Sequence, residues 1–195
     1  MASQTAKRPI RIGGASGGFT DRVAAIRRLA SDPGVDAVVG DWLSENVMTG
    51  YGAGKERRRA AGIDDRTLPL QERMKTAQYA STFLQCFEPA IPDLMKNKTK
   101  LVVNAGANDT ELLAEVVLDM IRKHGYDSRV AYVLGDEVTD QFKSMISDGH
   151  VFTSVTDGKT YHEWGHDAIC AQAYIGSFGI TEALREGADI VICGR

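Results

Sequence analysis

This sequence is poor in cysteine and tryptophan and carries no large excess of one charge. Its 195 residues include three cysteines and two tryptophans, and the formal net charge is −3. The odd, widely spaced thiols Cys86, Cys170 and Cys193 do not suit a disulfide framework or the paired spacing of a structural zinc site. A nearly neutral chain lacks the basic surface that binds nucleic acids or anionic membranes, so we expect neither as a partner.

Long apolar runs and targeting signals are also lacking. No stretch approaches the roughly 20 apolar residues that cross a bilayer. Residues 1–8 contain the cations Lys7 and Arg8 but no apolar segment behind them. We therefore expect a flexible amino-terminal arm over residues 1–8 rather than a signal or transit peptide. With its unpaired thiols, the composition predicts a cytoplasmic protein.

The rest of the chain, residues 9–195, has the composition and pattern of one α/β domain. Apolar residues make up 43% and charged residues 25%, as in an ordinary globular protein. Short apolar runs alternate with helical stretches, and strands separated by helices call for right-handed crossovers and a parallel sheet. The sequence predicts a three-layer, Rossmann-like sandwich with a mainly parallel sheet of about five strands. We expect strands at residues 9–12, 37–39, 100–103, 129–134 and 188–193, and helices at 21–31, 43–49, 69–87, 109–124, 138–147 and 167–185.

Two segments are expected to lie outside this alternation. Residues 50–68 contain glycines and the charged run 55–59, which indicates a mobile, solvated loop or insertion. Residues 150–155 and 159–164 flank Asp157-Gly158, a dipeptide typical of a tight hairpin turn.

The turns that follow the strands differ in character from those that precede them. Strand-to-helix turns of a parallel sheet share one edge, where such folds bind their ligands. The opposite turns, at residues 32–34, 124–126 and 186–187, are ordinary helix stops. We therefore expect a small-molecule site at the carboxyl edge, built from residues 13–18, 40–41, 104–108, 135–137 and 194–195.

The first of these turns is rich in glycine. Glycines let the backbone approach a ligand, and amides at the start of a helix attract anions. The loop matches neither the dinucleotide fingerprint nor the P-loop. Anion or carboxylate binding and a tight packing turn both remain open. The candidate ligand-binding residues here are Gly13, Gly14, Ser16, Gly17 and Gly18.

Polar side chains follow the later strands. Asp41, Asn104 and Asp136 are candidate catalytic residues, because they can supply acid–base groups and hydrogen bonds to a hydroxyl or carbonyl. Aspartate and asparagine also cap helices, so for each residue alone a capping role is the competing interpretation. The group together favours a site. Further candidate ligand-binding residues on these turns are Gly106, Asn108, Glu137 and Arg195.

Residues 162–166 match H-E-x-x-H, the zincin motif. Zinc requires both histidines on one face of a helix. Gly165 weakens a helix here, and no third ligand is evident, so a chance match is the better interpretation. The sequence predicts no metal and no other cofactor.

Several of these motifs together resemble the acyclic terpene utilisation AtuA-like family. The resemblance begins with Ile12 to Gly17 and Asp41 to Glu45, and it includes the strand-end motif Val103 to Gly106. It continues through Gly135-Asp136, Ala173 to Gly176 and Gly187 to Arg195. Order and spacing agree along nearly the whole chain, apart from the segment around residues 55–59 and the turn at Asn108-Asp109.

The resemblance implies a longer protein, with sequence after Arg195, and a setting in the breakdown of branched acyl-CoA or related carboxylic acids. We expect a lyase or hydratase in which the glycine loop, residues 13–18, holds a carboxylate or phosphate and Arg195 supplies the counter-charge. Asp41 or Asp136 would be the acid–base group, and Asn104 would polarise a carbonyl or hydroxyl.

Two other functions stay open. One is a non-catalytic subunit that binds the ligand and stabilises a partner enzyme. The other is a zinc hydrolase, which depends on His162 and His166 alone. The expected partners are a small carboxylate or acyl-CoA, together with a second copy of the chain or a partner subunit.

Overall fold

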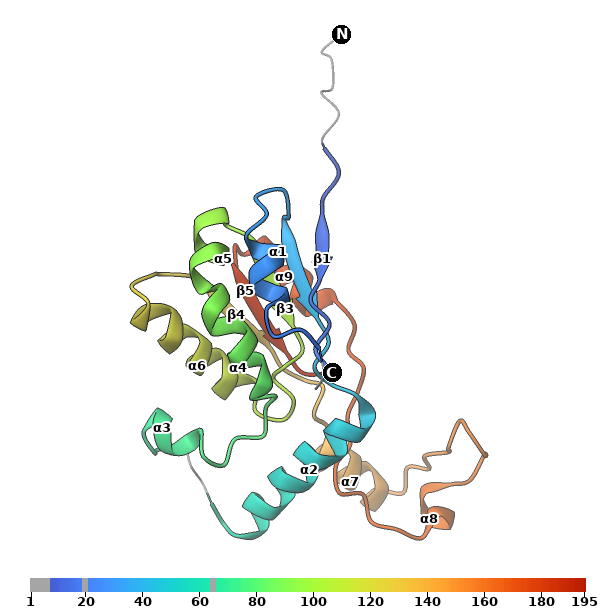
Figure 1. Cartoon of the computed structure of the whole chain (residues 1–195). Helices are drawn as coiled ribbons and strands as arrows, with labels where there is room; N and C mark the ends of the chain where they lie inside the picture. The colour runs from blue at the N-terminus through green and yellow to red at the C-terminus, as the bar shows by residue number, and fades with distance from the viewer. Residues whose placement is uncertain (1–7, 19–20, 64–65) are drawn as a thin grey trace.

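The computed structural model describes residues 8–18, 21–63 and 66–195 and is built around one parallel sheet (Figure 1). The strands are β1 (Ile12–Gly14), β2 (Ala37–Gly40), β3 (Lys100–Val103), β4 (Val130–Val133) and β5 (Ile190–Cys193). They lie in the order β1-β2-β3-β5-β4, and every neighbouring pair is parallel. The predicted α/β sandwich with a five-stranded sheet is confirmed, and the arrangement is compatible with a Rossmann-like fold.

The two faces of the sheet carry different helices. One face is covered by α1 (Ala25–Ala30), α4 (Thr82–Phe87), α5 (Ile91–Asn97) and α6 (Thr110–Lys123), with the 3-10 turn η1 (Glu88–Ala90) between α4 and α5 (Figure 1). The helix α9 (Phe178–Arg185) contacts β4 and β5. Because β5 lies back between β3 and β4, a right-handed crossover from β4 places α9 on the opposite face.

The main hydrophobic core lies between the sheet and the four-helix layer. Trp42, which follows β2, packs its ring edge-on to Phe83 with centroids 5.2 Å apart. Phe83 stacks in turn on Phe87. This core ties the turn after β2 to α4 and so fixes one wall of the carboxyl edge. Its fully buried members include Ile26, Val38, Ile91, Leu94, Leu101, Leu113, Ile121, Ile190 and Ile192.

The segment expected to be a mobile loop is mostly a helix. The helix α2 (Glu45–Ala60) begins at the Ser44 cap and extends beyond the carboxyl ends of the strands, near α7 (Thr139–Ser147) (Figure 1). Its glycines allow close approach, since a Cβ at Gly52 would lie 2.3 Å from Cys170 Sγ. Two of its cations pair with other segments: Lys55 contacts Glu137 at 2.8 Å and Arg58 contacts Asp109 at 2.7 Å. The charged run therefore holds the helix to its neighbours.

The helix predicted over residues 69–87 is interrupted. Only α3 (Leu70–Arg73) and α4 form, because the intervening backbone bonds elsewhere: the Ala80 amide donates to the Ala105 carbonyl at 2.9 Å. Asp109 makes no cap at the start of α6. Its carboxylate instead accepts hydrogen bonds from the Gln78 amide and from Arg58.

The long helix predicted over residues 167–185 is also wrong in its first half. The backbone of residues 171–173 runs antiparallel to residues 136–138, with a bridge between Glu137 and Gln172. The Ala173 amide donates to the Asp136 carbonyl at 2.7 Å. This pairing uses the amides that a helix would need, so α9 begins only at Phe178.

The predicted hairpin is reduced to one bridge between Thr153 and Thr160. Its second arm becomes α8 (Tyr161–Trp164), because Thr160 and Glu163 form a capping box. At the amino terminus, residues 1–7 of the expected flexible arm lie outside the described residues, and Arg8 pairs with Asp36 at 2.9 Å. Within the described part of the chain, no helix is long and apolar enough to cross a membrane.

Candidate functional site

The carboxyl ends of the strands border a cleft of about 270 Å³. Its walls come from the glycine loop, from the turn after β2 and the first turns of α2, and from Arg195, two residues after β5. The lining residues are Gly17, Gly18, Asp41 to Glu45, Val47, Tyr51, Ala80, Thr82 and Arg195. The parallel topology thus joins segments that are widely separated in the sequence.

Asp41 is one of two carboxylates that line this cleft, the other being Glu45, and Asn104 orients it. The Asn104 amide nitrogen donates to Asp41 Oδ1, while its carbonyl oxygen accepts from the Trp42 amide at 2.7 Å. Burial alone would raise the pKa of Asp41, but hydrogen bonds from Asn104 and Leu43 and the charge of Arg195 hold it below its usual value. Both polar atoms of the Asn104 side chain therefore make hydrogen bonds within the protein, one to the Trp42 amide and one to the Asp41 carboxylate.

Arg195 is the cation that lines the cleft. Its guanidinium lies 3.3 Å from Asp41 Oδ2 and 3.1 Å from Glu45 Oε1. It also lies over the ring of Tyr174, with Cζ 5.0 Å from the centroid. The Tyr174 hydroxyl donates to Glu45, and this hydrogen bond, with that of Arg195, lowers the pKa of Glu45 to about 2. One cation thus bridges two ionised carboxylates.

Asp136 contacts the backbone of Arg195 rather than its side chain. Its Oδ2 accepts a 2.7 Å hydrogen bond from the Arg195 amide. The residue is only 2% exposed, and this burial raises its pKa despite the hydrogen bond. A Cβ at Gly194 would lie 2.1 Å from the same oxygen, so glycine is required where the chain passes Asp136. Asp136 is beneath the cleft rather than on its surface.

The glycine loop is held by an internal carboxylate. The amides of Gly17 and Gly18 donate to Asp21 Oδ2 at 3.0 and 2.6 Å. Hydrogen bonds from Ser16 and from these two amides lower the pKa of Asp21. A Cβ at Gly17 would lie 2.3 Å from the Asp41 carbonyl oxygen, so this glycine lets the loop pack against the turn after β2.

The remaining residues singled out in the sequence lie outside the cleft. Asn108 and Glu137 line a separate cavity of about 20 Å³ beneath α2, a size suited to about one water. Asn108 Nδ2 is buried there without a hydrogen-bond partner among the described residues. Gly106 packs against Thr110. Gly13 packs against Leu29, and Gly14 and Ser16 line a different cavity.

Two residues of the cleft were not selected from the sequence, namely Glu45 and Tyr174. Both contact Arg195. Both also lie inside segments that carried the family resemblance, residues 41–45 and 173–176. The family motifs were therefore the sequence signal that could have identified Glu45 and Tyr174 as site residues.

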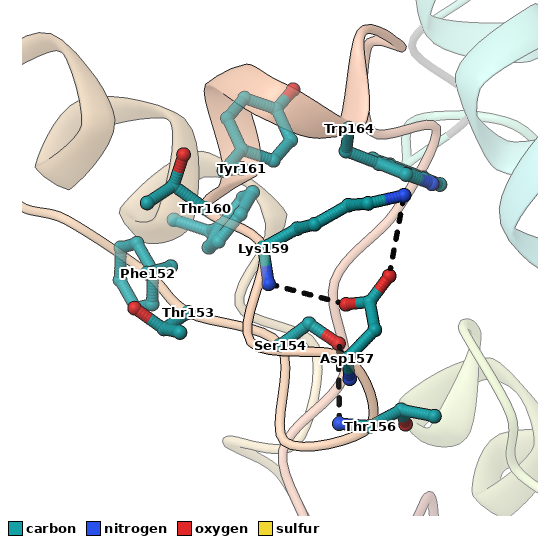
Figure 2. Close-up of a pocket in the computed structure, with 10 residues that line it drawn as sticks. Phe152, Thr153, Ser154, Thr156, Asp157, Lys159, Thr160, Tyr161 and Trp164 are labelled. Carbon is teal, nitrogen blue, oxygen red and sulfur yellow. Dashed lines mark hydrogen bonds and ion pairs between the residues drawn. The ribbon is translucent and has the colours of Figure 1, made fainter.

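A larger cavity of about 370 Å³ is lined by residues of α7, of α8 and of the segment between them (Figure 2). Its walls include Phe142, Phe152, Tyr161 and Trp164, and the Phe142 ring lies 4.7 Å from Phe152 and 5.2 Å from Tyr161. It shares no lining residue with the cleft. The rings around this cavity join α7 to α8, so we interpret them as a small accessory core. The titratable groups Asp41, Glu45 and Arg195 favour the cleft at the strand ends as the candidate site.

The H-E-x-x-H segment does not form a continuous helix. The helix α8 ends at Trp164, Gly165 adopts φ 75°, and Glu163 is engaged by Thr160. His162 lies on α8 and His166 beyond it. In the parts of the chain that the structure describes, no group of three or more potential metal ligands occurs.

Comparison with known proteins gives one result for the chain. The family model for the acyclic terpene utilisation family protein AtuA matches residues 10–195. Neither the curated proteins nor the solved structures give a significant match.

Proposed function

The chain belongs to the acyclic terpene utilisation family AtuA, and we propose that it is a lyase or hydratase acting on a branched acyl-CoA or a related carboxylic acid. The observation that carries this proposal is the contact of Asp41 with Arg195 in one cleft at the carboxyl edge, with Asn104 orienting Asp41 from behind. An ionised carboxylate beside a guanidinium provides both a proton acceptor and a counter-charge for a developing oxyanion.

In this proposal Asp41 is the general base. Its low pKa keeps it ionised, and its hydrogen bonds to Asn104 and Leu43 fix the direction of the carboxylate. For hydration, Asp41 takes a proton from water as the water oxygen adds to the carbon–carbon double bond of an unsaturated acyl group. The electron pair moves to the carbonyl oxygen, and the proton then returns to the neighbouring carbon. Elimination of water follows the reverse path.

Arg195 is the proposed counter-charge for the carbonyl or carboxylate oxygen. Its Nε is buried and has no hydrogen-bond partner among the described residues, so a ligand oxygen that reaches it by displacing Asp41 or Glu45 would satisfy a donor that the protein leaves unpaired. Asp136 is then a positioning residue, because it holds the Arg195 backbone while the guanidinium faces the cleft.

A non-catalytic ligand-binding subunit is the second candidate, and one observation favours it. Arg195 is already paired with Asp41 and Glu45, and the Gly17 and Gly18 amides are already bonded to Asp21. A ligand anion would have to displace these internal carboxylates. Ligand binding would then be coupled to a rearrangement of these side chains, and a partner enzyme could respond to that rearrangement.

The test is turnover of branched α,β-unsaturated acyl-CoA thioesters, followed by the loss of the conjugated carbonyl absorbance. Asp41→Asn should lower kcat by about 100-fold or more, since it removes the acid–base group. Asp119→Asn is the control, because Asp119 pairs with Lys123 on α6, away from the cleft. Saturable binding of the thioester without turnover, in wild type and both variants, would reject the enzyme and favour the binding subunit.

A further inference from the structure

A second cavity, of about 410 Å³, adjoins the first part of the glycine loop. Gly14 and Ser16 line it from the loop, and Arg22 and Arg28 line it from the segment that contains α1. It shares no lining residue with the cleft that holds Asp41. The glycine loop thus contributes to two cavities, and only one of them contains the groups of the proposed reaction.

The charge of this second cavity is dominated by two guanidinium groups. Arg22 and Arg28 are exposed, and neither side chain makes a hydrogen bond or ion pair with another described residue. Arg27, on the same helix, shows the usual alternative, because it pairs with Asp93 at 3.6 Å. Two unpaired cations that line one hollow favour an anionic occupant, since each lowers the energy of the same bound charge.

One acidic side chain, Asp21, also lines this cavity. Its Oδ2 accepts the amides of Gly17 and Gly18, so its charge is partly compensated by the loop itself. Neither arginine pairs with it. Two arginines against one aspartate leave the lining with an excess of one positive charge.

Gly14 is a glycine that the protein's own packing does not require. A Cβ there would meet no atom within 4 Å, whereas one at Gly13 would lie 2.7 Å from Leu29. Its φ is not in the left-handed region either, since Gly14 is absent from the positive-φ residues. A bare backbone at this wall leaves room for a ligand. Beside it, Ser16 adopts φ 58°, an uncommon conformation for a residue with a side chain, and its hydroxyl bonds to Asp21.

We propose that this cavity binds the phosphate group of a phosphorylated ligand, with Arg22 and Arg28 as its donors and the bare Gly14 wall beside it. Phosphate fits better than carboxylate because it offers three oxygens to donors from different directions, so that two guanidinium groups can bind one anion. The source is either free phosphate or a phosphate ester on a larger carrier. The inference does not depend on which reaction the cleft performs.

Titration calorimetry of the full chain at constant ionic strength tests this with inorganic phosphate, CoA and dephospho-CoA. We expect saturable binding of at least one phosphate-bearing probe. A preference for CoA over dephospho-CoA identifies an ester, and binding of inorganic phosphate equal to that of CoA identifies free phosphate. The double variant Arg22→Gln/Arg28→Gln should weaken binding about tenfold or more. The control, Arg27→Gln/Arg185→Gln, removes two other exposed cations and should change affinity less than about twofold.

A third variant tests the wall without changing charge. Gly14→Ala adds a methyl group that meets no protein atom, so its thermal midpoint should match wild type while its affinity for the phosphate probe falls. Three results would overturn the proposal: no binding by wild type, an equal loss in both double variants, or unchanged binding in Arg22→Gln/Arg28→Gln. An equal loss in both would mean that net charge alone attracts the anion.

Discussion

Asp136 accepts the backbone amide of Arg195 at 2.7 Å and is itself almost completely buried. Asp136 lies in the turn after β4, and it fixes the backbone of Arg195 just beyond the end of β5. In this way it helps to position the Arg195 guanidinium beside Asp41. Burial raises the pKa of Asp136. The burial of the carboxyl that organises the cleft therefore has a free-energy cost that depends on pH.

The pH dependence of stability should report this cost. Because the folded pKa of Asp136 lies above its unfolded value, the native state holds the proton more tightly, and its stabilising contribution is present at low pH and lost as pH rises through the folded pKa. Asp136→Asn cannot ionise and still offers an acceptor to the Arg195 amide. Urea unfolding between pH 3 and pH 7 should show the variant gaining stability relative to wild type as pH rises. A constant difference across this range would contradict the raised pKa.

Gly194→Ala should be destabilising although alanine is the smallest addition. Its Cβ would lie 2.1 Å from Asp136 Oδ2, so either the backbone or the buried carboxyl must move. We expect a loss of about 1–3 kcal/mol in the free energy of unfolding. Gly50→Ala is the matched control, since a Cβ there meets nothing within 4 Å and the residue lies inside α2. That change should stabilise the protein by about 0.5–1 kcal/mol. A denaturation midpoint higher for Gly194→Ala than for Gly50→Ala would contradict the close approach of Gly194 to Asp136.

Arg58 should matter more to folding than its neighbour Arg59. The Arg58–Asp109 pair is largely buried, with side chains 13% and 12% exposed. Asp109 also accepts the Gln78 amide, so Arg58→Gln leaves a buried carboxylate without its counter-charge and should cost about 3 kcal/mol. Arg59→Gln breaks an exposed pair with Asp140 and should leave the denaturation midpoint nearly unchanged. Equal effects would mean that the charged run acts only through net charge.

The Cys193 thiol should be nearly inert in the native protein. Burial, followed by the nearby charges of Asp136 and Asp41, raises its pKa to about 11. At pH 8 only about one thiol in a thousand is then ionised, and the thiolate is the reactive form. Timed alkylation with peptide mapping should show Cys193 labelled more slowly than Cys86 and Cys170, and the difference should vanish in denaturant. Rapid native labelling of Cys193 would contradict its burial.

The sheet could be predicted from the sequence because its strands are short apolar runs bounded by turn residues. The third strand was placed at residues 100–103, where β3 lies. The first was placed too early, since β1 pairs with β2 through Ile12 to Gly14 and so includes two glycines. Glycine is weak as a strand signal, but a partner strand supplies the hydrogen bonds whatever the side chain.

The errors in helix prediction come from contacts between distant segments. Gly52 and Gly54 suggested a loop, yet they let α2 approach Cys170 and Gln78. Residues 171–173 were expected to lie in a helix, but their backbone pairs with residues 136–138. Neither partner is adjacent in sequence, so local propensity could not identify it.

The candidate site was easier to locate than to complete. Asp41 and Asn104 directly follow strands and Arg195 lies two residues after one, so the parallel topology alone brings them together. Glu45 and Tyr174 lie inside α2 and in the segment before α9, so their contacts with Arg195 depend on where those elements pack. Asn108 and Glu137 also follow strands but turn toward the cavity beneath α2.

The pH dependence of kcat/KM for an unsaturated branched acyl-CoA, measured on wild type and Asn104→Ala, tests the role of Asp41 most directly. Hydrogen bonds from Asn104 and Leu43 and the charge of Arg195 lower the pKa of Asp41 against the opposing effect of burial. Removing Asn104 should therefore raise that pKa and move the acidic limb of the profile to higher pH, with the alkaline limb unchanged. An acidic limb at the same pH in both proteins, or full activity in Asp41→Asn, would contradict the assignment of Asp41 as the acid–base group.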